Sequence, residues 1–327
     1  MKFILKALLS CILIFNASAL FANETTWVTI MRSDGIMIPF ALFKDGKWVN
    51  SWPETGSADA SLKLEKLSDI PKKWLSNSSF VPSKWFMTNN KGIKHTLNAL
   101  KPVKYSAHCE GNWGLLTDYP SPVESEYATI PKVGIALNKD SKAYAAVILS
   151  PESQNKEVVS VIEREFNRIE ALEIVKEKNK GPQESSIISY IGHPVNPSLR
   201  NKISIKISEM YQIDIKHTGD SYYFFIATRS YIKPQGHPDQ ECEAISFFNG
   251  VITHKKGSNY KLHQGHLDLT DCDMKYVGSS TPLGIIKIQN NYYLVQENMG
   301  YESESYSIIE IKGNKFEKVF HLFGGGC

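Results

Sequence analysis

Short alternating runs of apolar and polar residues dominate the chain, and turn-forming pairs separate them. The first runs fill residues 27–49, where Asp34-Gly35 and Asp45-Gly46 divide three strand-like segments. Asp-Gly favours two-residue hairpin turns because both turn residues need a positive φ. The pattern predicts a three-stranded meander. Pro39 marks an edge or a bulge in it, because proline cannot donate a backbone hydrogen bond.

The same pattern becomes denser towards the C-terminus. Residues 133–149 predict a hairpin around Asn138–Ser141, and residues 244–254 predict another across Asn249-Gly250, a dipeptide typical of hairpin turns. Further strands and hairpins are predicted from three stretches, residues 203–232, 285–296 and 306–320. We therefore expect a mainly β (α+β) fold of antiparallel hairpins and meander sheets.

One helical pattern interrupts these strands. Five apolar residues recur every three or four positions and form one stripe, with charged residues on the opposite face: Val158, Ile162, Phe166, Ile169 and Leu172. Ser150 is a suitable cap, Pro151 suits the first turn, and Gly181-Pro182 suits the end. The pattern predicts one long amphipathic helix over residues 151–181 that packs on a sheet.

The pattern divides the chain into four parts. We expect a signal peptide at residues 1–22, a Trp-rich β-hairpin region at 23–150, the packed helix at 151–181 and an antiparallel β-meander domain at 182–327. Turns followed by an aromatic residue recur at Trp48, Tyr292 and Phe316, which fits either propeller blades or ordinary hairpins.

The first 22 residues have the pattern of a secretory signal. Lys2 and Lys6 precede an apolar run that is too short to span a bilayer, and cleavage sites follow Ala19 and Ala22. Cys11 also suggests a lipobox, but apolar residues follow it where a polar tether is expected. We predict a secreted protein with no stable membrane span, or alternatively a periplasmic one. The style of the signal suggests a bacterial source.

Composition and charge exclude several classes. The 327 residues include 37 basic and 34 acidic side chains, and loss of the signal's two lysines leaves 37 − 2 = 35 against 34, a net charge of +1. The longest basic runs are pairs such as Lys72-Lys73, so we expect no nucleic-acid partner. The apolar share of 42% argues against both a disordered chain and a multi-span membrane protein.

Four cysteines remain after the signal, which in an oxidising compartment predicts two disulfides: Cys109, Cys242, Cys272 and Cys327. Three pairings are possible. Any complete pairing joins Cys109 to a partner at least 242 − 109 = 133 residues away. A bridge to Cys327 would order the Gly324–Gly326 tail. A thiol-protease role for His108-Cys109 is not expected, because adjacent positions rarely provide the required geometry.

The strongest catalytic or metal candidates lie between residues 237 and 273. His263, His266 and Asp268 carry ligand types that suit zinc or another divalent ion. His266 and Asp268 would share one face of a strand. His237 and Asp239 could join them if Cys242 bridged Cys272. Asp-rich loops also commonly form turns without binding a metal, because Asp side chains bond their own backbone. We predict no cofactor, with a divalent metal as an alternative.

Tryptophan is confined to the first 113 residues. Trp48 and Trp52 lie near a turn and are the candidates for an exposed platform, although tryptophans also fill cores. The predicted function is non-catalytic binding of an extracellular ligand, which could be a glycan, a small ligand or a partner protein, as in a bacterial secreted effector-like protein. The alternative is a secreted hydrolase, metal-assisted or not, with its site in the 237–273 loops.

Overall fold

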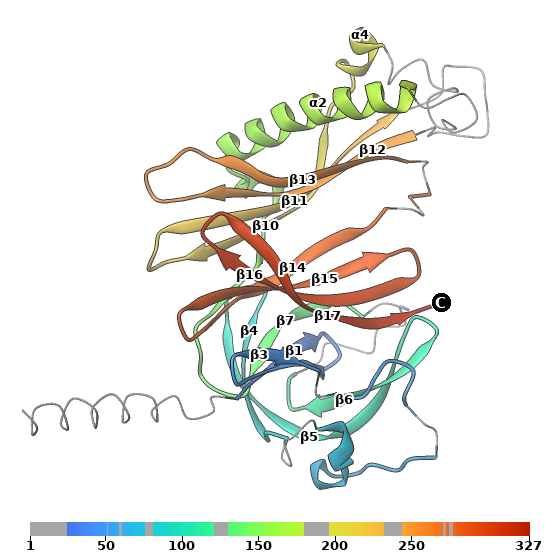
Figure 1. Cartoon of the computed structure of the whole chain (residues 1–327), viewed down its shortest axis with the longest axis vertical. Coiled ribbons are helices and arrows are strands. Elements are labelled where there is room, and N and C mark those ends of the chain that lie inside the picture. The colour runs from blue at the N-terminus through green and yellow to red at the C-terminus, as the bar shows by residue number, and fades with distance from the viewer. Residues whose placement is uncertain are drawn as a thin grey trace, which may run out of the picture.

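The computed structural model describes residues 25–50, 52–58, 61–75, 81–120, 130–179, 196–231, 244–270, 273–274 and 277–327. In this part of the chain the protein is mainly β, with antiparallel sheets and one long helix, as the pattern predicts. Four layers are stacked in the order helix, sheet, sheet and closed sheet (Figure 1). The predicted signal peptide lies outside the described residues.

The N-terminal strands form a sheet that closes on itself. β1 pairs with both β2 and β7, and the ring continues through β4, β5 and β6 back to β2, while the short β3 extends β2. The strands are β1 (Thr26–Arg32), β2 (Ile36–Lys44), β3 (Lys47–Val49), β4 (Lys84–Asn89), β5 (Lys94–Ala107), β6 (Glu110–Thr117) and β7 (Lys132–Leu137). Two short 3-10 turns, η1 (Leu67–Asp69) and η2 (Lys72–Trp74), precede β4.

The predicted meander over residues 27–49 is confirmed. Asp45 and Gly46 both have positive φ values, as the two-residue turn requires. The β1–β2 register skips Phe40, next to Pro39, so the predicted bulge is also present. β1 is buried along its whole length, because Trp27 and Met31 face the interior of the closed sheet while Val28 and Ile30 face the next layer.

Two four-stranded meanders follow in the C-terminal half. The first comprises β10 (Lys206–Ile215), β11 (Asp220–Tyr231), β12 (Ala244–His254) and β13 (Lys261–Thr270). The second comprises β14 (Ser279–Ile288), β15 (Asn291–Gly300), β16 (Ser303–Lys312) and β17 (Lys315–Gly326). Apolar side chains fill the space between the two meanders and the space between the second meander and the closed sheet.

The predicted hairpin over residues 133–149 is wrong. β7 stays in the closed sheet, whereas β8 (Ala143–Ala145) pairs with β14 and β9 (Val147–Ile148) pairs with β10. One short segment therefore supplies a fifth strand to both meanders. It does so because its backbone finds partners in the later sheets and not in the strand that precedes it.

The predicted turn at Asn249-Gly250 is also wrong, because β12 runs straight through it. A Cβ at Gly250 would lie 2.5 Å from the Gln264 carbonyl oxygen and 3.0 Å from the Phe225 ring. The glycine therefore permits a close approach between strands and does not form a turn. The hairpins predicted within 285–296 and 306–320 are confirmed as β14–β15 and β16–β17.

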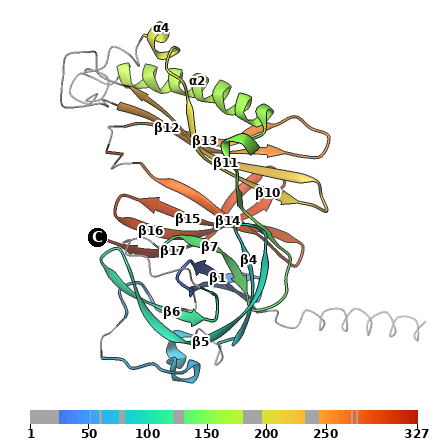
Figure 2. The same ribbon diagram turned by 180° about the vertical axis from the view of Figure 1, so that it is seen from behind.

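Helix α2 (Lys156–Asn179) covers the outer face of the first meander (Figure 2). It begins later than predicted, because Pro151–Ser153 forms a 3-10 turn (η3) and the Asn155 side chain accepts the Glu157 amide at 2.8 Å. The short helix α4 (Pro197–Arg200) follows. The helix end predicted at Gly181-Pro182 lies outside the described residues.

The buried row of α2 follows a spacing of four: Val158, Ile162, Phe166, Glu170 and Ile174. Leu172 is 51% exposed, which corrects its place in the predicted stripe, because a row of four drifts around the helix. Buried Glu170 accepts a hydrogen bond from Tyr231 at 2.5 Å and pairs with Arg229. None of the helices in the described ranges has the length and apolar character needed to cross a membrane.

Candidate functional site

The predicted His–Asp pair is present on β13. The His266 Nε2 and Asp268 Oδ1 atoms lie 2.9 Å apart on one face of the strand, as alternation predicts. His263 instead packs on the Phe316 ring at 4.5 Å, and burial, with a smaller effect of Lys255, lowers its pKa. Within the described ranges, no three His, Cys, Asp or Glu side chains gather as a metal site. His237 and Asp239 lie outside these ranges, so a shared site stays a prediction.

The exposure predicted for Trp52 is wrong. Its side chain is only 5% exposed, and its indole nitrogen donates to the Trp113 carbonyl at 2.6 Å. Trp48 is half-buried and contacts the rings of Phe43 and Tyr293. Most of the N-terminal tryptophans fill the interior of the closed sheet, whereas Trp48 packs between this sheet and the second meander. Ligand binding by Trp48 and Trp52 stays a prediction.

The long-range disulfide is present as Cys109–Cys327, with a sequence separation of 218 residues. It joins the β5–β6 turn to the end of β17, and it orders the glycine tail as the sequence suggests. Cys242 and Cys272 lie outside the described residues, so their pairing stays a prediction.

A polar pocket lies at the strand ends beside this disulfide. Its volume is about 290 Å³. The residues that we use to define it, the Phe323 pocket, come from all four strands of the second meander: Ser280, Asn298, Ser303, Ser305, His321 and Phe323. These strands bring together the hydroxyl, amide and imidazole groups of the pocket beside one aromatic ring.

Asn298 organises the polar wall of the Phe323 pocket. Its amide oxygen accepts a hydrogen bond from Ser280 at 3.0 Å, and its amide nitrogen donates to Ser307 at 3.0 Å. Ser307 in turn contacts the His321 ring nitrogen at 3.3 Å. The network holds these side chains in fixed directions, which lowers the entropy lost when a ligand binds.

Phe323 forms the apolar side of the pocket and is 46% exposed. Its ring lies over Gly326, where a Cβ would come within 2.9 Å of the ring carbon Cζ. Its carbonyl accepts a hydrogen bond from Thr55 at 2.6 Å, and the Gly324 carbonyl accepts one from Asn112 at 3.1 Å. The closed sheet therefore holds the strand that presents Phe323.

A buried ion cluster supports the pocket from the other face of the sheet. The Lys132 ammonium lies 2.9 Å from a Glu297 oxygen and 2.7 Å from a Glu304 oxygen. Tyr306 donates to Glu304 at 2.5 Å. Burial raises the pKa of Glu297, although nearby Lys132 acts in the opposite direction. One cation thus ties β7 of the closed sheet to β15 and β16.

Sequence reasoning missed this pocket because its residues are scattered over more than 40 positions (280 to 323). Only the glycine tail with its terminal cysteine pointed to the region. A second available signal was the recurrence of serine at every second position, Ser303, Ser305 and Ser307. No protein-family model, curated protein or solved structure matches this chain.

Proposed function

We propose that the protein is an exported, non-catalytic binding protein that takes an extracellular glycan into the Phe323 pocket. One observation carries the proposal. A half-exposed aromatic ring stands beside a wall of ordered hydroxyl, amide and imidazole groups.

This combination suits a sugar. A sugar ring presents an apolar C–H face and an edge of hydroxyl groups that both donate and accept hydrogen bonds. An aromatic ring can cover the apolar face. Ser, Asn and His side chains can serve the hydroxyl edge, because together they offer both donors and acceptors. The pocket, at about 290 Å³, is near the lower end of the usual range for ligand sites.

Export is part of the same proposal. The disulfide supports it, because Cys109 and Cys327 are both exposed and such bonds persist mainly in oxidising compartments. The signal pattern of residues 1–22 points the same way.

Glycan-array screening followed by calorimetry tests the binding proposal. We expect a glycan that binds the wild-type protein to bind the Phe323→Ala variant about fivefold more weakly, because stacking contacts contribute on the order of 1 kcal/mol. Leu100→Ala is the matched control, since it removes another exposed apolar side chain from β5. Equal loss in both variants, or no binding across a broad array, would contradict the proposal.

A hydrolase remains the second candidate, and the hydrogen-bonded His266–Asp268 pair favours it. A carboxylate can orient a histidine that acts as a general base. If a glycan that binds is also cleaved, His266→Ala should abolish cleavage while binding in the Phe323 pocket persists. Cleavage that survives in His266→Ala would remove this candidate.

A further inference from the structure

We propose that the opposite end of the two meanders is a second binding surface, for an anionic polysaccharide. This surface goes beyond the proposed function, because it lies at the hairpin turns and not at the strand ends that form the Phe323 pocket. We call it the lysine end and define it by six residues: Lys139, Lys142, Lys216, Lys255, Lys261 and Lys287.

Contacts between turns bring the lysine end together. The β10–β11 turn meets β15 where the Tyr292 hydroxyl bonds His217. The same turn meets the β12–β13 turn, since a Cβ at Gly219 would lie 3.2 Å from the Lys256 side chain. In Figure 1 the β10–β11 and β12–β13 turns lie together at the left of the molecule. These contacts place the turns that carry the lysines at one end of the meanders, although the lysines span residues 139–287.

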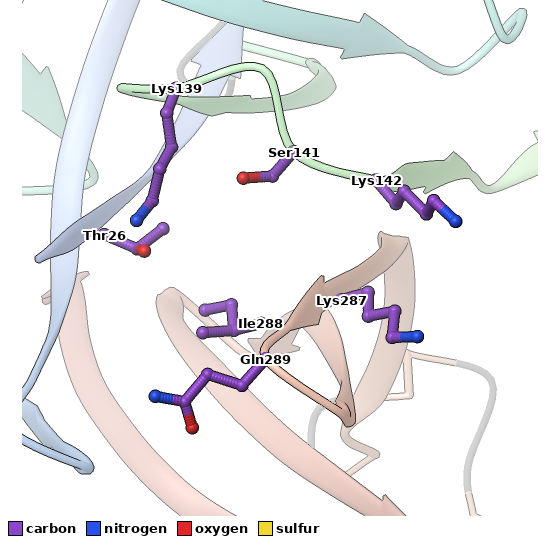
Figure 3. A pocket seen from close by; sticks show the side chains of 7 residues that line it. All are labelled: Thr26, Lys139, Ser141, Lys142, Lys287, Ile288 and Gln289. Atoms are coloured by element: carbon purple, nitrogen blue, oxygen red, sulfur yellow. The ribbon is translucent and has the colours of Figure 1, made fainter. Parts of the chain in front are cut away.

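Besides the pocket that Lys216 lines, two further concave pockets lie within this end. The first, about 260 Å³ in volume, is formed by β1, the β7–β8 connection and the β14–β15 turn. Figure 3 shows Lys139 and Ser141 directed into it, while Lys142 and Lys287 extend together to one side. The buried Thr26 hydroxyl lies in its wall and has no hydrogen-bond partner among the residues that the structure describes.

The second pocket, about 290 Å³ in volume, lies between the β12–β13 and β16–β17 turns. Lys255, Lys261 and Asn314 line it beside His263. The positive charge of Lys255 helps to lower the pKa of His263, after the larger effect of burial. Ammonium, hydroxyl and amide donors converge in each pocket, which suits the oxygens of a sulfate or carboxylate group.

Aromatic rings lie between the first pocket and the β10–β11 turn. Tyr144 and Tyr292 flank the exposed His217 ring, with centroid distances of 6.1 and 5.8 Å. The Lys287 ammonium lies 5.5 Å from the centre of the Tyr292 ring. A polymer that runs from the first pocket towards this turn would therefore cross apolar ring faces between its charged groups.

The charge balance at this end is positive. Asp140, Asp214 and Asp220 are the acidic residues beside the six lysines, which leaves 6 − 3 = +3. Gln212 and Ser221 already donate hydrogen bonds to Asp214. The six lysines therefore outnumber the acidic residues beside them.

Pocket shape favours a polysaccharide over the other polyanions. Substituents spaced along a flexible chain can enter separate concave pockets, whereas a flat bilayer surface cannot. The cations of this end are lysines, and recognition of nucleic acid relies strongly on the bidentate contacts of arginine. An exported protein would also meet polysaccharides outside the cell.

Binding to dextran sulfate at low ionic strength tests the proposal, with uncharged dextran as the reference polymer. We expect the Lys142→Gln, Lys216→Gln, Lys255→Gln triple variant to bind dextran sulfate on the order of 100-fold more weakly, because each lysine near an anionic surface contributes roughly 1 kcal/mol. All three lysines are exposed, and they line three different pockets. Affinity for dextran sulfate should also fall as salt is added.

The matched control is the Lys63→Gln, Lys72→Gln, Lys73→Gln triple variant, which removes the same charge from exposed positions of the closed-sheet region. Equal weakening in both triples would overturn the proposal, because net charge alone would then explain binding. Preferential binding to anionic phospholipid vesicles or to duplex DNA would also overturn it. Phe323→Ala should bind dextran sulfate like wild type, which separates a failure here from a failure of the proposed glycan pocket.

Discussion

The two ends of the second meander use charge in opposite ways. At the strand ends near the disulfide, Lys132, Glu297 and Glu304 are nearly buried and satisfy one another. At the hairpin end, Lys312 and its neighbours lie on the surface, and the Lys312–Glu317 pair is exposed. Water screens the exposed pair but hardly reaches the buried one. The same residue types therefore hold layers together at one end and form solvent-screened surface pairs at the other.

Lys132→Met should have the largest effect on stability. It leaves Glu297 and Glu304 buried without their cation, and breaking such a buried pair typically costs about 3–5 kcal/mol. Urea unfolding measures the free energy of unfolding. Lys142→Met at the hairpin end is the control, expected within about 0.5 kcal/mol of wild type. Equal losses of stability at both positions would show that the two ends of the meander do not differ in how they use charge.

Removal of the Cys109–Cys327 disulfide should have the second-largest effect on stability. The Cys109→Ser, Cys327→Ser double variant loses a constraint over 218 residues, for which about 2–4 kcal/mol is typical. Thermal unfolding reports the loss, and hydrogen exchange should speed up in β17 more than in β14. Unchanged exchange near Phe323 would mean that the closed sheet alone orders this strand.

Glu297→Gln should have a smaller effect, about 1 kcal/mol or less near neutral pH, because Lys132 keeps its contact with Glu304. The pKa of Glu297 is raised in the folded state, so the folded protein holds its proton to higher pH than the unfolded chain. Wild-type stability relative to the variant should therefore fall as pH rises from about 4.5 through the raised value. Urea unfolding curves across this range measure the difference in stability between wild type and variant. The opposite slope would show that Lys132 affects the pKa of Glu297 more strongly than burial does.

The smallest stability effect is expected for the triple variant of Lys142, Lys216 and Lys255 to Gln. Because these side chains are exposed, the triple variant as a whole should stay within about 0.5 kcal/mol of wild type. Thermal unfolding checks this expectation. A large loss of stability would show that the hairpin end also holds the layers together, which would remove the contrast between the two ends.

Local turn chemistry made part of the fold predictable. Asp45-Gly46 and Gly313-Asn314 specify their hairpins because the turn residues themselves favour the required backbone. The same rule wrongly predicts a turn at Gly250, because the role of this glycine depends on Phe225 and Gln264 in other strands. The pairing of residues 143–148 was equally hidden, since it is decided by strands that come more than 50 residues later.

The candidate site was less predictable than the fold. The long-range disulfide beside the pocket was predictable from the number and positions of the cysteines, because Cys109 needed a distant partner. The polar wall did not, since Ser280, Asn298 and His321 become neighbours only when four strands align. The Trp pair does not form an exposed platform, because Trp52 packs in the interior of the closed sheet and Trp48 packs against the second meander.

The shared segment of residues 143–148 has a consequence for the order of folding. A ribosome delivers these residues well before their partners in β10 and β14, so the segment must wait, unpaired, while both later sheets are made. Its docking then closes the edges of two sheets at once, which should make the stack fold as one cooperative unit late in the process.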